Sequence, residues 1–374
     1  SLSDEHELYF NNPAVERVSA YQKHTGRIVP IYPETKGLTS KGLRFLIAPL
    51  LEALTAPEWI PADVLASARL PSASDALHTI HFPKTVEDAI AARARFAFED
   101  IFLLQLLNLQ QKESLAKESA LAIPTDLEWL KHILAGLPFA LTASQKQSLW
   151  EIIKNIGEPH PMNRLLQGDV GSGKTVVAAL AAVLTARAGY QTAFMAPTEV
   201  LAIQHYETLK KLFHGISAHI QPAVGLLTGS TAKIFYETDL ESNTSPAALR
   251  AKIASGDIPI VIGTHALISE SHPPAGGAKS TGQRARGSPM SRSTFKQLGL
   301  AIVDEQHRFG VSQRRALIQQ SGTSSCTPHF LSMSATPIPR TLMLTVFGDL
   351  DVSLITELPA GRKPITTRII SPRD

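Results

Sequence analysis

Residues 168–175 read G-D-V-G-S-G-K-T, which is the spacing of a phosphate-binding loop. Glycines let backbone N–H groups approach a triphosphate closely, because no Cβ blocks the way. Lys174 would place its ammonium on the β- and γ-phosphates, and the Thr175 hydroxyl would bind Mg²⁺. The predicted nucleotide-binding residues of the loop are Gly168, Gly171, Ser172, Gly173, Lys174 and Thr175.

The sequence around the loop fits this chemistry. A short apolar run at 165–166 precedes it, and the Ala-rich segment 176–188, with apolar residues at helical spacing, follows it. The order strand, loop, helix adds the positive end of a helix dipole to the phosphate site. A glycine-rich turn that happens to hold a lysine is the alternative, and a second motif argues against it.

That second motif is an acidic pair, Asp304 and Glu305, after the apolar run 298–303. At the end of a buried parallel strand, Asp304 would hold Mg²⁺ and Glu305 would polarise the attacking water. A solvated acidic turn is the ordinary alternative for such a pair. Together with Lys174, the pair predicts a site that binds and hydrolyses a nucleoside triphosphate, with Mg²⁺ as cofactor.

Composition sets broad limits. The 374 residues, 44% of them hydrophobic, predict two or three soluble domains. No apolar run reaches the roughly 18 residues of a membrane span, and the start shows no export signal, so we expect no membrane association and a cytoplasmic location. The one cysteine, Cys326, excludes an internal disulfide, and the 13 histidines show no metal-binding spacing.

The net charge of +3 is local. Residues 271–297 carry five basic and no acidic residues, so the rest of the chain sums to 3 − 5 = −2. This stretch is rich in Gly, Pro and Ser, which predicts a disordered surface insertion. It is either a basic tether for DNA phosphates or a tolerated insertion without a role.

The chain divides by pattern. Residues 40–137 show helical periodicity, with a long helix expected over 85–118 and a shorter one that begins in a capping box at Thr125 and stops near Gly136. After Pro138, strand-like and helical runs alternate, which predicts an α/β fold: a parallel sheet with helices on both faces. Ligands of such sheets bind at the carboxyl ends of the strands.

Four further segments narrow the function. Residues 196–205 and 263–268 each follow a strand, so polar groups and helix N-termini gather at one sheet edge where a phosphate backbone could lie. Residues 334–336 put two hydroxyls near the acidic pair, and Gln145 offers an amide to an adenine edge. Each segment alone would more often be a cap or a turn.

In this order the segments resemble the first motor domain of superfamily 2 helicases, and specifically the RecG family of branched-DNA helicases. The matching stretches are L-L-Q-G-D-V-G-S-G-K-T, A-P-T-E-V-L-A-I-Q-H, G-T-H-A-L-I, D-E-Q-H-R-F-G-V, S-A-T-P-I-P-R-T-L, G-D-L-D-V-S and L-P-A-G-R-K-P-I. Upstream, residues 30–38 resemble the close of that family's wedge domain and residues 89–105 its long linker helix.

The resemblance implies a RecA-like P-loop NTPase fold at 139–358, preceded by a helical linker region at 39–138 and a remnant of an OB-type wedge domain at 1–38. Residues 359–374 would begin the connection to a second motor domain. It implies that Lys174, Asp304 and Glu305 drive ATP hydrolysis and that Gln145 reads adenine. It further implies coupling roles for Gln306, His307, Ser334 and Thr336, and DNA contacts for Thr198, Gln204, Thr264 and His265.

RecG enzymes remodel stalled forks and Holliday junctions, so branched DNA, ATP and replication-fork proteins are the implied partners of an expected monomer. The arginines that complete the ATP site from a second motor domain are not in these residues, and we expect weak ATP binding without unwinding. Two alternatives remain: a translocase like the transcription-repair coupling factor, which typically has Glu where this chain has Gln306, or a catalytically silent nucleotide-binding module. A transporter ATPase is disfavoured, since its signature is not visible.

Overall fold

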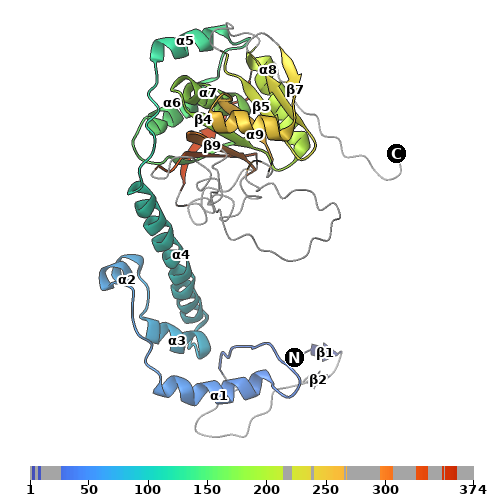
Figure 1. Ribbon diagram of the computed structural model, residues 1–374. Helices are drawn as coiled ribbons and strands as arrows, with labels where there is room; N and C mark the ends of the chain where they lie inside the picture. The colour runs from blue at the N-terminus through green and yellow to red at the C-terminus, as the bar shows by residue number, and fades with distance from the viewer. Residues whose placement is uncertain are drawn as a thin grey trace, which may run out of the picture. The chain divides into compact units, whose positions relative to one another are not determined.

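The computed structural model describes residues 2–4, 7–9, 27–213, 221–236, 240–264, 267, 295–305, 326–335, 348 and 350–359. The chain forms two compact units, residues 1–107 and 108–374 (Figure 1). The domain boundaries expected near 38 and 138 stay predictions beside this division. Most of the predicted basic insertion, and residues 360–374, lie outside the described residues.

The first unit is mainly helical. Its elements are β1 (Leu2–Asp4), β2 (Glu7–Tyr9), α1 (Ser40–Ala53), α2 (Ala62–Ala68), α3 (Ala73–His81) and most of α4 (Val86–Ala116). The long helix predicted over 85–118 is therefore confirmed as α4. It begins with reciprocal bonds in which Thr85 N donates to Asp88 Oδ2 and Asp88 N to Thr85 Oγ1, both at 3.1 Å. These bonds satisfy donors that a helix start leaves unpaired.

A buried arginine organises this unit. The Arg95 side chain on α4 is fully buried and donates to Glu99 Oε2 at 2.6 Å and to Glu58 Oε1 at 2.9 Å. A buried guanidinium needs such partners, because desolvation of an unpaired charge is costly. The bond to Glu58 therefore fixes the loop before α2 against α4, while the bond to Glu99 lies within α4.

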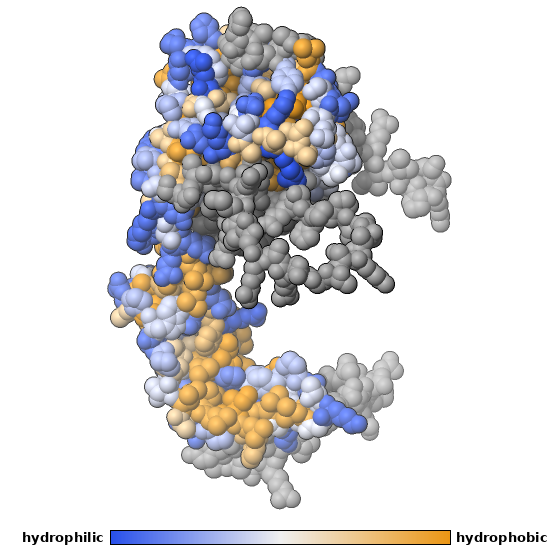
Figure 2. All heavy atoms as spheres, in the orientation of Figure 1, coloured by the Kyte–Doolittle hydropathy of each residue, from blue (hydrophilic) through white to orange (hydrophobic). Residues whose placement is uncertain are grey.

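Helix α1 keeps part of its apolar face in solvent. Leu51 is buried, but Leu46 and Leu50, which lie in the apolar pattern that predicted this helix, are 55% and 65% exposed. Figure 2 shows this face as a continuous hydrophobic area over α1. The apolar pattern thus predicts the helix correctly, but within the described residues it does not predict that the apolar face is buried.

The second unit is built on one large sheet. Its helices are α5 (Leu127–Gly136), α6 (Ala143–Ile156), α7 (Lys174–Arg187), α8 (Glu199–Phe213) and α9 (Pro246–Ser255). Its strands are β3 (Asn163–Gly168), β4 (Gln191–Met195), β5 (Val224–Leu227), β6 (Ala232–Phe235), β7 (Glu241–Asn243), β8 (Ile260–Gly263), β9 (Leu298–Asp304), β10 (His329–Ser334) and β11 (Asp351–Ile355).

The strand order is β11-β3-β10-β9-β4-β8-β5-β6-β7, and the strands from β11 to β5 pair in parallel. The α/β fold with a parallel sheet is confirmed, with one addition: β5, β6 and β7 pair antiparallel at one edge. This makes the sheet mixed. The order also puts β10 between β3 and β9, so the ends of these three strands meet.

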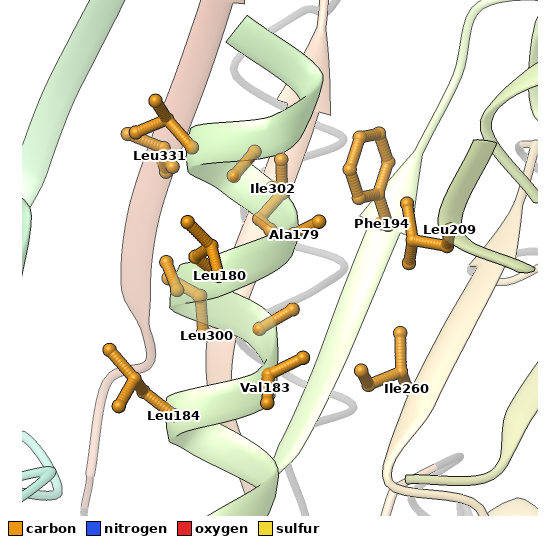
Figure 3. Close-up of a cluster of buried hydrophobic side chains, with 14 of the residues drawn as sticks. Ala179, Leu180, Val183, Leu184, Phe194, Leu209, Ile260, Leu300, Ile302 and Leu331 are labelled. Atoms are coloured by element: carbon orange, nitrogen blue, oxygen red, sulfur yellow. The ribbon is translucent and has the colours of Figure 1, made fainter. Parts of the chain in front are cut away.

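Alternate side chains of the central strands pack into two cores on opposite faces of the sheet, as the two-residue period of a strand requires. Phe194, Leu300 and Ile302 pack under α7 on one face (Figure 3), whereas Ala193, Ala301 and Val303 belong to the core of the opposite face. The first core also takes buried residues of α5, α6 and α8, and the second takes Leu249 and Ile253 of α9. Helices therefore cover both faces, as expected.

One predicted helix start is wrong in detail. Helix α5 is present and ends at Gly136, but its N-cap is Asp126, whose Oδ1 accepts from the backbone N–H groups of Glu128 and Trp129 at 3.1 Å. Thr125 Oγ1 is buried and finds no hydrogen-bond partner in the described part of the chain. Asp and Thr are both good caps, so adjacent candidates are hard to separate by type alone.

No helix among the described residues has the length and apolar character needed to cross a membrane. The same part of the chain holds no group of three or more His, Cys, Asp or Glu side chains arranged to bind a metal. The described residues contain no disulfide that involves Cys326.

A buried histidine joins the sheet to the segment before α5. His329 Nδ1 accepts from Met162 N at 3.0 Å, and its Nε2 donates to Leu121 O at 2.8 Å. This pattern needs the neutral ring with its proton on Nε2. Burial lowers the pKa of His329 below its usual value, while the bond to Leu121 opposes that shift.

We therefore expect acid to destabilise this unit through His329. As pH falls through about 6.5 the unfolded chain binds a proton, whereas the folded chain binds it only at lower pH. The free energy of unfolding therefore decreases as pH falls in this range, by at most about 1.4 kcal/mol per pH unit. His329→Gln, whose amide can make both bonds but does not titrate, should show a smaller loss. Urea midpoints of both proteins at neutral and mildly acidic pH measure this, and equal losses would contradict it.

Candidate nucleotide-binding site

The loop between β3 and α7 has the backbone that its glycines predict. Gly171 and Gly173 have φ of 80° and 89°, the left-handed region that favours glycine. A Cβ at Gly173 would also collide with the side-chain amide of Gln145. Glycine is therefore needed there for both conformation and space.

Lys174 begins α7 and turns its side chain back over the loop. Its Nζ donates to the backbone oxygens of Gly168, at 2.7 Å, and Asp169, at 3.0 Å. Burial lowers the pKa of Lys174, and the negative charges of Asp304, Glu305 and Asp169 partly oppose that effect. The acidic pair is thus close enough to act on the lysine.

The acidic pair ends β9 in a constrained geometry. Asp304 is 9% exposed, and its Oδ1 accepts from Glu305 N at 3.1 Å. Glu305 has a φ of 55°, a conformation that costs an L-residue about 1–2 kcal/mol. Such strain is typical of functional positions.

The sheet brings the predicted residues to one edge. Ser334 pairs in register with Gln167, one residue before the loop, and Met333 pairs with Asp304. The ends of β3, β10 and β9 therefore lie in a row, with Ser334 buried between the loop and the acidic pair. Sequence reasoning placed these residues together, and the register provides that arrangement.

The residues present fit a magnesium nucleotide. A lysine and the start of α7 offer positive charge to phosphates, while the Thr175 hydroxyl and the Asp304 carboxylate are oxygen ligands of the kind Mg²⁺ prefers. The Ser172 hydroxyl is buried in the loop without a hydrogen-bond partner among the described residues. An unsatisfied polar atom in a phosphate loop is consistent with a site that gains a ligand.

Gln145 braces the loop from α6. Its Oε1 accepts from Thr142 N at 2.9 Å in a capping box, and its Nε2 donates to Ser172 O at 2.7 Å. An amide has two N–H donors and two lone pairs, so these bonds use one of each. The predicted reading of adenine stays a prediction, and the structure adds support of the loop as a second role.

Of the residues expected to contact DNA, Thr198 and Thr264 are described just beyond the carboxyl ends of β4 and β8. Thr198 is exposed before α8, where its Oγ1 accepts from Leu201 N at 3.3 Å. Gln204 is exposed on α8, and Thr264 follows β8 directly. Their DNA contacts stay predictions. His265, Gln306, His307 and Thr336 lie outside the described residues.

Two supporting residues were not predicted. His205 Nε2 lies 2.8 Å from Asp304 Oδ2, and Glu357 accepts from Ser144 N at 3.1 Å at the start of α6. The bond from Ser144 N lowers the pKa of the Glu357 carboxyl. His205 had a readable signal, because it follows Ala202 by three positions on the apolar face of α8; Glu357 had none.

Comparison with known proteins places this geometry in a family. Residues 142–345, which begin at the cap of α6 and include the loop and the acidic pair, match the DEAD/DEAH box helicases. The chain belongs to this family. The RecA-like fold expected for it is accordingly present in the second unit.

The resemblance to RecG is also confirmed. The chain is 38% identical to the ATP-dependent DNA helicase RecG of Synechocystis sp., over 98% of the chain and 40% of that protein. It is 40% identical to RecG of Streptococcus pneumoniae serotype 4, over 91% of the chain and 45% of that protein. A structure of RecG bound to a three-way DNA junction matches with a TM-score of 0.67 and 36% identity, covering 91% of this chain and 41% of that one.

The chain thus spans less than half the length of these relatives. Their names support an ATP-dependent DNA helicase in general terms.

The strain at Glu305 gives a stability test. We expect Glu305→Gly to be more stable than Glu305→Ala by a few tenths to about 1 kcal/mol. Glycine avoids the penalty of the left-handed conformation, and this gain exceeds the loss from the greater conformational entropy that glycine gives the unfolded chain. At exposed Lys154 in α6, alanine should instead be better than glycine by about 0.5–1 kcal/mol. Denaturant unfolding of the four variants measures both orders, and the same order at both sites would contradict the strain.

Proposed function

We propose that this chain provides the ATP-binding motor of an ATP-dependent DNA helicase of the RecG type, which remodels branched DNA such as stalled forks and Holliday junctions in recombination and repair. The observation that carries the proposal is the convergence of Lys174 with Asp304 and Glu305 at one sheet edge. The similarity to RecG proteins, one of them bound to a three-way DNA junction, supports the choice of DNA.

The residues of the site divide the work. Lys174 exchanges its two backbone carbonyls for the β- and γ-phosphates, and the loop N–H groups hold the remaining oxygens. Thr175 and Asp304 would hold Mg²⁺, which when bound would supply charge neutralisation for phosphoryl transfer. Glu305 orients and polarises the attacking water, and its constrained backbone limits where that carboxylate can lie.

The DNA side of the proposal uses the same edge. Thr198, Gln204, Thr264 and His265 would contact the strand, and Gln306, His307, Ser334 and Thr336 would couple nucleotide state to it. The ends of β4 and β8 lie side by side, since Met195 and Gly263 pair in register. Thr198, after β4, and Thr264, after β8, therefore follow neighbouring strand ends, as a continuous phosphate-binding edge requires.

We further propose a cytoplasmic monomer that works with replication-fork proteins.

The described residues hold one motor sheet, and arginines from a second motor domain can contribute 10³ to 10⁵ in rate. The 374-residue chain alone should therefore bind ATP without unwinding forks. Unwinding by the purified chain would contradict this part.

Nucleotide binding tests the core of the proposal. Lys174→Met should weaken binding of a fluorescent ATP analogue at least about tenfold, because a charge-assisted contact of about 1.5–3 kcal/mol is lost. Lys154→Met, which removes an exposed lysine of α6, is the matched control and should bind like the wild type. Equal affinity of all three proteins would overturn the assignment of the loop.

DNA separates a motor from a silent nucleotide-binding module. A chain that retains the motor's DNA edge should bind both a three-way junction and linear duplex of equal length, with affinity falling as salt rises. A fluorescence anisotropy titration on both DNAs measures this. Absence of DNA binding, with nucleotide binding intact, would favour the silent module.

A further inference from the structure

The buried face of α8 contains one titratable side chain that contacts the predicted metal site. The buried residues of this helix are Ala202, His205, Tyr206, Leu209, Leu212 and Phe213. All except His205 are apolar or aromatic residues of the core under the sheet. His205 is 7% exposed, and a polar ring at such a position needs a partner.

The partner is the carboxylate of Asp304. His205 Nε2 and Asp304 Oδ2 are 2.8 Å apart, and the imidazole lies against Phe194 of β4 with ring centroids 4.7 Å apart. Asp304 Oδ1 accepts from Glu305 N at 3.1 Å. An ionised carboxylate only accepts, so Nε2 carries the proton that makes the bond. Both carboxylate oxygens are therefore held, each by a different donor.

A core histidine that has simply found an acceptor is the plain alternative. The identity of the acceptor argues for more, because Asp304 is the carboxylate that must present its remaining lone pairs to Mg²⁺. Each oxygen has about two lone-pair positions and uses one of them. Hydrogen bonds that orient metal-binding side chains typically change metal affinity 10- to 100-fold when removed.

We propose that His205 is a positioning residue for the magnesium site: its Nε2–H fixes the Asp304 carboxylate in the orientation that binds Mg²⁺. The inference rests on the proposed ATP-binding function. It adds His205 of α8, which lies outside the phosphate loop and the acidic pair, to the residues that determine the affinity of the site for Mg²⁺.

Two replacements separate the hydrogen bond from packing. His205→Phe keeps a planar ring against Phe194 and removes the donor, whereas His205→Gln keeps an amide N–H at similar reach. His132→Phe makes the same chemical change at an exposed histidine of α5 and serves as the control. Circular dichroism first checks that each variant is folded.

The measurement is binding of the fluorescent ATP analogue over a range of Mg²⁺ concentrations, without turnover. His205→Phe should need about 10- to 100-fold more Mg²⁺ for half-maximal binding. Its affinity for the analogue without Mg²⁺ should stay at the wild-type value, since Lys174 and the loop are unchanged. His205→Gln should stay within a few-fold of the wild type, and His132→Phe should match it.

Two results would overturn the proposal: an unchanged Mg²⁺ requirement in His205→Phe, or equal impairment in the Phe and Gln variants, which would assign the effect to packing. A wild-type chain that binds no nucleotide at any Mg²⁺ concentration would instead remove the proposed function, and this inference with it. If His205→Phe does not fold, His205→Ala, which removes the donor without adding bulk, is compared with Asp304→Asn and the double variant. Independent, additive effects there would equally reject the coupling.

Discussion

The site depends on keeping one positive charge where water is scarce. The Lys174 side chain is largely buried, which by itself disfavours the ammonium, and two backbone carbonyls together with nearby carboxylates maintain it. A backbone carbonyl is a weaker partner for an ammonium than a phosphate oxygen, because hydrogen bonds between ionised groups are stronger than those to neutral acceptors. The folded chain thus holds a lysine whose best ligand is an anion from outside, while Asp304 and Glu305 stand beside the place that this anion would take.

That arrangement follows from strand order rather than from proximity in sequence. The loop follows β3 and the acidic pair follows β9, yet β10 alone separates these strands in the sheet. Parallel pairing puts all three carboxyl ends at the same edge, and the register then aligns Ser334 with Gln167 and Met333 with Asp304. The alternation of side chains into two cores locks that register, since a slip of one residue in β9 would move Leu300 and Ile302 to the wrong face. Core packing therefore fixes the distances on which the chemistry depends.

The sequence predicted what strong local patterns encode. Residue types and spacings that fit few other structures mark the phosphate loop, the acidic pair, the long helix α4 and the central strands. It did not reveal β6 and β7, because these strands are short and β7 is exposed, so no apolar alternation marks them. Nor could it show that Leu46 and Leu50 remain exposed, since a helical pattern does not say what covers it. The sequence also did not predict the positive φ of Glu305, because this conformation arises where the chain turns at the end of a buried strand.

The bonds that support the site were hardest to predict, since each joins elements far apart in the sequence. Gln145 of α6 holds the loop through Ser172, and His205 of α8 holds Asp304. Helix α8 also begins with Glu199, whose Oε1 accepts from the Thr228 hydroxyl after β5 at 2.6 Å. Thr198, which is proposed to contact DNA, directly precedes this helix, and His205 on the helix contacts the proposed metal ligand. Under the proposed function, α8 is thus one element shared by the DNA edge and the metal site, and such a shared element is what coupling between two sites requires.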